Sequence, residues 1–356
     1  MAVPVIYSAR YRIDIGLHVF PTQKYQLVHD RLIAIQESAG QALSFVEPDP
    51  ATWDELALVH TAEYLARLRA GTLSAEEIGE LELPWSEAMV EGFRLMVGGT
   101  VQAALRACGL GSQKSEGGSL MNSSTPSDVT SDFTLPTSDF PLPTSDFRVA
   151  VHIGGGLHHA FRNHGEGFCP LNDVAVAVRV LQERGIERAA IVDLDVHHGN
   201  GTAFIFERDP RVFTFSMHQQ HNYPMWKPRG SLDVGLPDGV HDATYLAELE
   251  KALPTVMANR PQCVFYLAGA DPYEDDQLGG LRLTREGLRQ RDRMVIDAAF
   301  ASHVPLVIVL AGGYARNVDD TVAIHVATIE EAVKASAETR KHEARKGPWF
   351  RPSPAE

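Results

Sequence analysis

The segment Val192–Gly201, VDLDVHHGNG, constrains the fold more than any other part of the sequence. It places two aspartates and two histidines within six positions, directly after an apolar run and before two glycines. On a β-strand, residues two apart point to the same side, so Asp193, Asp195 and His197 are expected to project together. Three polar groups at the end of a buried strand are costly to desolvate unless they are paired or bind a metal ion.

Apolar runs of this kind alternate with helical patterns along the chain. The expected strands are 3–8, 148–153, 189–196, 211–217, 263–270 and 305–313, and the expected helices are 171–185, 241–258 and 284–302. Several runs are apolar and β-branched throughout, which is typical of strands buried on both faces of a parallel sheet. The alternation predicts an α/β fold with three layers, αβα, and a central, mostly parallel sheet. Ligands in such folds bind at the carboxyl ends of strands.

We expect residues 1–340 to form one domain. Within it, segment 109–147 is rich in Ser, Thr, Pro, Gly and Asp and repeats Thr-Ser-Asp-Phe every seven residues. Its prolines exclude a coiled coil, so a low-complexity, disordered insertion is predicted. Residues 341–356 are expected to be a C-terminal tail.

Composition restricts the class of partner. A hydrophobic content of 44% in 356 residues allows a large core, and a formal net charge of −14 argues against nucleic acid and anionic membranes as partners. The sequence has no signal-peptide pattern and no membrane-spanning apolar stretch. The three cysteines, Cys108, Cys169 and Cys263, lack CxxC spacing and fit reduced thiols. We therefore expect a cytoplasmic protein, while the oligomeric state stays open.

The strand ends suggest a metal site. A catalytic zinc usually has three protein ligands, and Asp195 and His197 would supply two of them. Asp271 ends the run CVFYLAGAD in the same kind of position and is expected to supply the third. Two carboxylates and one imidazole suit Zn²⁺ and also Fe²⁺ or Mn²⁺, so the residues leave the metal open.

Two further strand ends carry groups suited to proton transfer. The turn GGGLHHA presents His158 and His159, and a neutral imidazole can take a proton from water and return it to a leaving group. Asp193 is free to orient one of these rings. Tyr314 follows the turn LAGG, where its hydroxyl could donate to a carbonyl oxygen that gains negative charge. Each turn, taken alone, also fits an ordinary glycine loop with exposed side chains.

Together these motifs resemble the zinc-dependent histone deacetylase family, which shares its fold with arginase. GGGLHHA, EGFCPLNDVAVAV, VDLDVHHGNGT, AGADPYEDDQLGGL and AGGY occur in the family's order. The opening YSARYRIDIGLHVFPTQKY and the segment LGGLRLTREGLRQRD are similar to the class IV branch and its bacterial relatives. The resemblance implies an arginase/deacetylase-like fold and covers nearly the whole chain outside the insertion.

The resemblance also implies a role for each site residue. It implies zinc ligands at Asp195, His197 and Asp271, and catalytic residues at His158, His159, Asp193, Asn200 and Tyr314. His159 would act as general base and then general acid, and His158, paired with Asp193, would hold water and stabilise the oxyanion. Tyr314 would polarise the substrate carbonyl. A structural potassium ion would be bound by Asp193, Asp195, His197, Ser216 and Met217.

The substrate channel is implied in the same way, by Gly167, Phe168, Tyr223 and Leu278, with the Gly167 carbonyl accepting the substrate amide N–H. Two residues depart from the commoner pattern. Asn200 stands where class I members have an aspartate behind the general base, which should make His159 less basic. Leu157 replaces an aromatic residue and leaves room for an acyl group longer than acetyl.

The implied function is a metal-dependent hydrolase that removes acetyl or longer acyl groups from the side-chain amine of lysine by attack of activated water. Its substrate would be an acyl-lysine protein or peptide, or an acylated amine metabolite. One alternative is an acetylpolyamine or other small-molecule amidohydrolase of the same fold. A second, from another class, is a catalytically silent acyl-lysine reader. An arginase-like ureohydrolase is disfavoured, because a two-manganese cluster needs more carboxylates.

Overall fold

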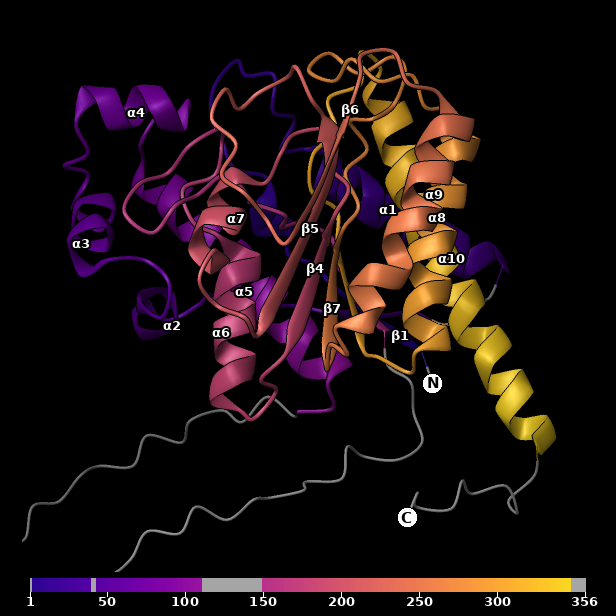
Figure 1. Ribbon diagram of the computed structural model, residues 1–356. Helices are drawn as coiled ribbons and strands as arrows, with labels where there is room; N and C mark the ends of the chain where they lie inside the picture. The colour runs from indigo at the N-terminus through magenta and orange to yellow at the C-terminus, as the bar shows by residue number, and fades with distance from the viewer. Residues whose placement is uncertain (1, 40–42, 111–148, 347–356) are drawn as a thin grey trace, which may run out of the picture.

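The computed structural model describes residues 2–39, 43–110 and 149–346 (Figure 1). Of the insertion predicted at 109–147, only the first two residues belong to this part of the chain. Most of the predicted tail also lies outside it. Residues 341–346, the beginning of that tail, belong to the last helix.

A parallel sheet of eight strands forms the centre of the described structure, in the order β2-β1-β3-β8-β7-β4-β5-β6. The strands are β1 (Val3–Ile6), β2 (Leu43–Val46), β3 (Val149–His152), β4 (Ala189–Asp193), β5 (Val212–Gln219), β6 (Leu232–Leu236), β7 (Cys263–Leu267) and β8 (Leu306–Val309). Every described pairing between these strands is parallel. The predicted α/β class is therefore confirmed.

Helices cover both faces of this sheet. In Figure 1, α5, α6 and α7 lie on one side, and α1, α8, α9 and α10 lie on the other. The helices are η1 (Ala9–Tyr11), α1 (Lys24–Ala39), α2 (Trp53–Ala57), α3 (Ala62–Ala70), α4 (Ala75–Leu81), α5 (Glu87–Ala107), α6 (Asp173–Glu183), α7 (Asn200–Phe206), α8 (Asp242–Ala258), α9 (Arg285–Ala301) and α10 (Val318–Lys346). Among these described helices, none has the length and apolar character needed to cross a membrane.

Burial explains which strands the sequence predicted. Every residue of β3, β4, β7 and β8 is buried, because helices pack on both faces, and such strands appear in the sequence as uninterrupted apolar runs. The outermost strands, β2 and β6, contain exposed positions and were not predicted. The six predicted strands are all present, although most end earlier than expected.

The topology brings four of the buried strands together in the order β3-β8-β7-β4. Because they are parallel, their carboxyl ends meet at one edge of the sheet. The segments that leave these ends begin at Ile153, Leu194, Ala268 and Leu310. They contain GGGLHH, the end of VDLDVHH, AGAD and LAGGY, so one edge collects all four motifs.

A buried arginine on α9 supports two of these segments. Arg291 is 0% exposed, and its Nη1 donates to the Gly269 carbonyl oxygen at 2.6 Å and to the Leu194 carbonyl oxygen at 3.4 Å. Its guanidinium also donates to Asp292 Oδ1, with Nε at 3.0 Å and Nη2 at 2.8 Å. This one side chain therefore ties the ends of β4 and β7 to the helical layer.

Replacing Arg291 with alanine should destabilise the fold strongly. The change leaves the buried Asp292 carboxylate without its cation, a loss that typically costs about 3–5 kcal/mol. Urea unfolding followed by circular dichroism measures the effect. Lys251→Ala is the matched control, because Lys251 is 69% exposed and its pair with Glu248 should contribute less than about 1 kcal/mol. Equal losses for the two variants would contradict the assigned role of Arg291.

Candidate active site

The chain leaves the sheet at the beginning of the site. β4 ends at Asp193 and not at Val196 as predicted, because carboxylates replace the next strand as hydrogen-bond acceptors. The Asp195 N–H donates to Asp193 Oδ1 at 3.2 Å, and the Val196 N–H donates to Asp271 Oδ1 at 2.9 Å. The His197 N–H donates to Asp195 Oδ1 at 3.0 Å. The side chains that form the site therefore also hold its backbone.

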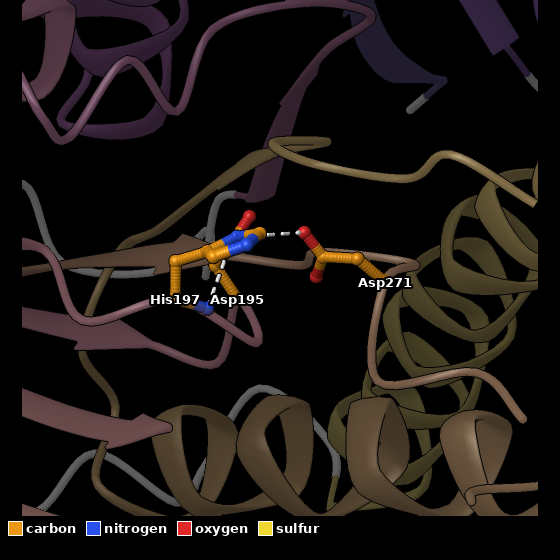
Figure 2. A group of neighbouring side chains, drawn as sticks. All are labelled: Asp195, His197 and Asp271. Carbon is orange, nitrogen blue, oxygen red and sulfur yellow. Dashed lines mark hydrogen bonds and ion pairs between the residues drawn. The ribbon is translucent and has the colours of Figure 1, made fainter. Parts of the chain in front are cut away.

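These contacts gather Asp195, His197 and Asp271, which Figure 2 shows with the Asp271 carboxylate directed at the His197 ring. One potential ligand atom from each residue lies within 4.8 Å of the others, and all three side chains are buried. His197 Nδ1 is 3.0 Å from Asp195 Oδ1 and 3.5 Å from Asp271 Oδ2. The three residues predicted as ligands are thus brought together from the ends of the adjacent strands β4 and β7.

The cluster fits a divalent cation. Asp271 Oδ2 is buried, and within the described part of the chain it has no hydrogen-bond partner. A Cβ atom on Gly312 would lie 2.0 Å from that oxygen and 2.5 Å from Asp195 Oδ2, so glycine keeps this space open. The pKa of Asp271 is raised to about 7 by burial and by the negative charge of Asp195. A cation would relieve the excess negative charge, and the donor set suits zinc or ferrous iron.

The two histidines after β3 differ in their surroundings. His158 Nδ1 donates to Asp193 Oδ2 at 2.7 Å, and the Nε2 atoms of His158 and His159 are 3.1 Å apart. Burial lowers the pKa of His158, but the charges of Asp193 and Asp195 outweigh it and raise the pKa to about 9. Burial and the charges of His158 and His197 lower the pKa of His159 well below its usual value. The pair therefore combines a cationic ring with a neutral one.

Tyr314 reaches the site from the end of β8. Its backbone N–H donates to Asp276 Oδ2 at 2.6 Å, and Asp276 Oδ1 accepts from the N–H groups of Leu278 and Gly279, both at 2.9 Å. Asp276 thus holds the segments that carry Tyr314 and Leu278. Burial and the charges of Asp195 and Asp271 raise the pKa of the Tyr314 hydroxyl well above its usual value, so it stays protonated and able to donate.

The site opens into a pocket of about 210 Å³. Its lining includes the predicted channel residues Gly167, Phe168, Tyr223 and Leu278, together with His158, His159, Asp195, His197 and Tyr314. A Cβ atom on Gly167 would lie 2.8 Å from His159 Cδ2 and 2.9 Å from Tyr223 Cε1, and its φ is +51°, so this position requires glycine. Leu157 also lines the pocket, beside His158.

The residues predicted for potassium lie on and just beyond β4 and β5. Asp193 and Ser216 are partners in the register of these strands, and Met217 follows in β5. Ser216 Oγ lies 3.0 Å from His218 Nδ1, and both Asp193 oxygens have partners in the site. Potassium binding stays a prediction.

Sequence reasoning missed several ionisable residues of the site, among them Lys24, Glu166 and Asp276. Lys24 is 0% exposed, its Nζ donates to the Ala311 carbonyl oxygen at 2.9 Å, and it lies 5.5 Å from the centre of the Tyr314 ring. Glu166 contacts Asn200 and Tyr223. All three lie inside the motifs that carry the family resemblance. Their position in these motifs could have identified them as site residues.

Cys169 is a further pocket residue. Its Sγ donates to the Gly167 carbonyl oxygen at 3.3 Å, and burial raises the pKa of the thiol well above its usual value. Cys108, Cys169 and Cys263 are all buried and free of disulfides.

Asp271→Asn should abolish tight zinc binding, because it removes one of the two carboxylates that would hold the ion. We expect the native protein to take up about one equivalent of zinc and to gain a zinc-dependent increase in Tm that the variant lacks. Metal analysis after dialysis and thermal unfolding with and without zinc measure both effects. Asp275→Asn, at a side chain 48% exposed, is the control. Zinc affinity unchanged in Asp271→Asn would remove Asp271 from the ligand set.

Comparisons with known proteins agree with this geometry. A family model described as the histone deacetylase domain matches residues 18–329. An uncharacterised protein of Picosynechococcus is 37% identical over 328 residues, covering 91% of this chain and 96% of that protein. The acetoin utilization protein AcuC of Bacillus subtilis is 30% identical over 302 residues, covering 78% and 68% respectively.

The fold is also found among solved structures. The crystal structure of an HDAC homolog complexed with SAHA has a TM-score of 0.71 at 24% sequence identity, covering 96% of this chain and 89% of that one. This likeness confirms the predicted arginase/deacetylase-like fold. Since the family model extends over most of the chain, the chain belongs to the histone deacetylase family of metal-dependent deacylases.

Proposed function

We propose that the protein removes acetyl or longer acyl groups from the side-chain amine of lysine in proteins or peptides, by attack of water on the amide carbon. The observation that carries the proposal is the buried Asp195–His197–Asp271 cluster, which shares a pocket with the His158–His159 pair and Tyr314. Family membership supports the same reaction.

Zinc is the proposed metal, held by Asp195, His197 and Asp271, and ferrous iron is the alternative. When bound, a divalent ion supplies Lewis acidity that polarises the amide carbonyl and lowers the pKa of water from 15.7 toward about 7. We also propose a structural potassium ion bound by Asp193, Asp195, His197, Ser216 and Met217. The adjacency of Asp193 and Ser216 in the sheet supports that site.

His159 is the proposed general base and acid. Its lowered pKa keeps the ring neutral, so it has a lone pair to accept the proton of the attacking water. It then returns that proton to the leaving lysine amine. His158, cationic and paired with Asp193, provides positive charge beside the forming oxyanion.

Tyr314 is the proposed donor to the substrate carbonyl oxygen as that oxygen gains charge. Its place in the pocket and its protonated hydroxyl support this role. The Phe168, Tyr223 and Leu278 side chains would surround the aliphatic part of lysine, and the Gly167 carbonyl would accept the substrate amide N–H. Leu157 would leave space for an acyl chain longer than acetyl.

We also propose that the protein belongs to the class IV branch, which its opening segment resembles, and three residues of that segment lie at the site. Phe20 and Tyr25 line the pocket, and Lys24 lies behind Tyr314. We also propose that the protein works in the cytoplasm. Its three free cysteines support a reducing compartment.

An acylated amine metabolite is the second candidate substrate. It is favoured by Glu82, which is exposed and lines the pocket, because a carboxylate there would attract the distant ammonium group of a polyamine. The uncharged Leu278 at the same pocket favours acyl-lysine.

Tyr314→Phe should lower kcat by about 10²–10³, the usual cost of removing one donor to a developing oxyanion. KM and bound zinc should change little, because the ring and its packing remain. Steady-state kinetics on an acyl-lysine peptide and metal analysis of the same preparation measure these quantities. Turnover close to that of the native protein would exclude Tyr314 from the reaction.

A substrate panel tests the proposed function directly. Zinc-quantified protein is assayed on acetyl-, octanoyl- and myristoyl-lysine peptides and on an acetylpolyamine. We expect kcat/KM to be highest for one of the acyl-lysine peptides. A higher value for the acetylpolyamine would favour the metabolite, and Glu82→Gln should then reduce that value selectively. Binding of acyl-lysine without hydrolysis of any substrate would favour a silent reader.

A further inference from the structure

Glu166 is an acidic residue beside the general base with no role in the proposed reaction so far. It lies in the short loop before Phe168, where its N–H donates to the Cys169 carbonyl oxygen at 3.2 Å and its carbonyl oxygen accepts from the Cys169 N–H at 2.9 Å. These two bonds fix the backbone of the loop. The carboxylate is 20% exposed and points toward the site.

Two side chains of the site donate to the same carboxylate oxygen. Asn200 Nδ2 donates to Glu166 Oε1 at 2.9 Å, and the Tyr223 hydroxyl donates to it at 2.6 Å. His164 Nε2 is 3.7 Å from Glu166 Oε2. Burial raises the pKa of Glu166, but hydrogen bonds from His164, Tyr223 and Asn200 outweigh it and lower the pKa overall. The carboxylate is therefore ionised and can only accept hydrogen bonds.

This restriction sets the direction of the whole chain of hydrogen bonds. Because Glu166 can only accept, Asn200 must turn its amide nitrogen toward Glu166 and its oxygen toward His159. Asn200 Oδ1 then accepts from His159 Nδ1 at 2.7 Å, so Nδ1 carries the proton. His159 Nε2 is left with its lone pair, and Nε2 is the atom next to His158 in the pocket.

We propose that Glu166 is a positioning residue for the general base: acting through Asn200, it holds His159 in the tautomer whose Nε2 can accept a proton. The inference rests on the proposed function, in which His159 accepts the proton of water. An amide alone could present either its oxygen or its nitrogen to the ring. The carboxylate behind it makes the amide present its oxygen and polarises that oxygen toward the imidazole. From the other side, a His158 ring protonated on both nitrogens donates from Nε2 to His159 Nε2 and favours the same tautomer.

The first experiment observes the tautomer without any turnover. Histidine-labelled protein, zinc-loaded and metal-free, is examined by ¹H–¹⁵N NMR, with the His159 signals assigned by comparison with His159→Gln. We expect a protonated Nδ1 and an unprotonated Nε2 in the native protein. In Glu166→Gln the side-chain amide at position 166 can either accept from Asn200 or donate to it. Asn200 can then turn either its oxygen or its nitrogen toward His159, and signals of both His159 tautomers should appear. A single, unchanged Nδ1–H tautomer in the variant would overturn the proposal.

The second experiment exchanges the carboxylate at position 166 and the amide at position 200, first singly and then together. Glu166→Gln should lower kcat about 10–100-fold, the usual cost of losing a group that orients an active-site histidine, with a smaller change in KM. Asn200→Asp should also be impaired, because two carboxylates would face each other at hydrogen-bond distance. In the double variant, the amide introduced at position 166 donates to the carboxylate introduced at position 200, and the direction of the chain is restored.

The double variant should therefore be more active than either single variant. Activity at or below that of the weaker single variant would overturn the relay, as would a kcat for Glu166→Gln equal to the native value. Tyr223→Phe separates the two contacts of Glu166, because the effect of Glu166→Gln on kcat should persist in that background. Glu76→Gln, an exposed carboxylate on α4, is the control.

The two proposals fail in different ways. A native protein that hydrolyses no substrate of the panel would remove the proposed function, while the NMR experiment would still decide whether Glu166 sets the tautomer. Normal hydrolysis together with an unaffected Glu166→Gln variant would remove the relay alone.

Discussion

Hydrogen bonds from departing backbone N–H groups to buried carboxylates are the interaction on which the site depends. Beyond the end of β4, the N–H groups of the chain no longer have a neighbouring strand to donate to. The carboxylates of Asp193, Asp195 and Asp271 accept these hydrogen bonds in place of strand carbonyl groups. The Gly312 N–H donates to Asp195 Oδ2 in the same way at 2.9 Å. The N–H groups of Asp195, Val196 and His197 therefore have acceptors where the chain turns out of the sheet inside the protein, and the same hydrogen bonds fix the direction of each carboxylate. Structure and chemistry at this edge use the same atoms.

Concentrating carboxylates in a dry site requires compensating positive charge. His158 supplies part of it, because the charges of Asp193 and Asp195 raise its pKa to about 9 in spite of the opposing effect of desolvation. Lys24, whose Nζ is 5.5 Å from the centre of the Tyr314 ring, also contributes: burial lowers its pKa to about 8, although the charges of Asp271, Asp195 and Asp276 act in the other direction. Arg291 donates to the Leu194 and Gly269 carbonyl oxygens and so stabilises the two segments that carry the cluster. The cationic groups thus lie around the cluster on several elements, and the space between the carboxylates is left for an ion.

The sequence predicted the structure well where burial on both faces makes a strand apolar at every position. The central strands are apolar at every position, and the motifs at their ends could be assigned to one edge of a parallel sheet, which brought Asp195, His197 and Asp271 together correctly. It was less informative where a partner lies far away in the chain. Lys24 and Ala311 are separated by 287 positions, and nothing local to Lys24 indicates that its ammonium is buried. Glu166 meets Asn200 and Tyr223 only when its loop packs against the beginning of α7 and the loop after β5. The end of β4 was misplaced for a related reason, since alternation does not reveal that Asp271 replaces a neighbouring strand as acceptor.

The environment of Cys169 has a consequence for the chemistry that the pocket tolerates. Its thiol donates to the Gly167 carbonyl, and burial keeps the pKa well above that of a free cysteine, so very little thiolate forms at neutral pH. A sulfur atom in the wall of a hydrolytic pocket would ordinarily attract electrophiles and peroxide. Here it serves as a soft, polarisable packing group, and reagents that alkylate or oxidise exposed thiols should pass the reaction chamber without modifying it. Selective blockers of this pocket are therefore expected to rely on its shape and its polar groups, and not on a covalent bond to Cys169.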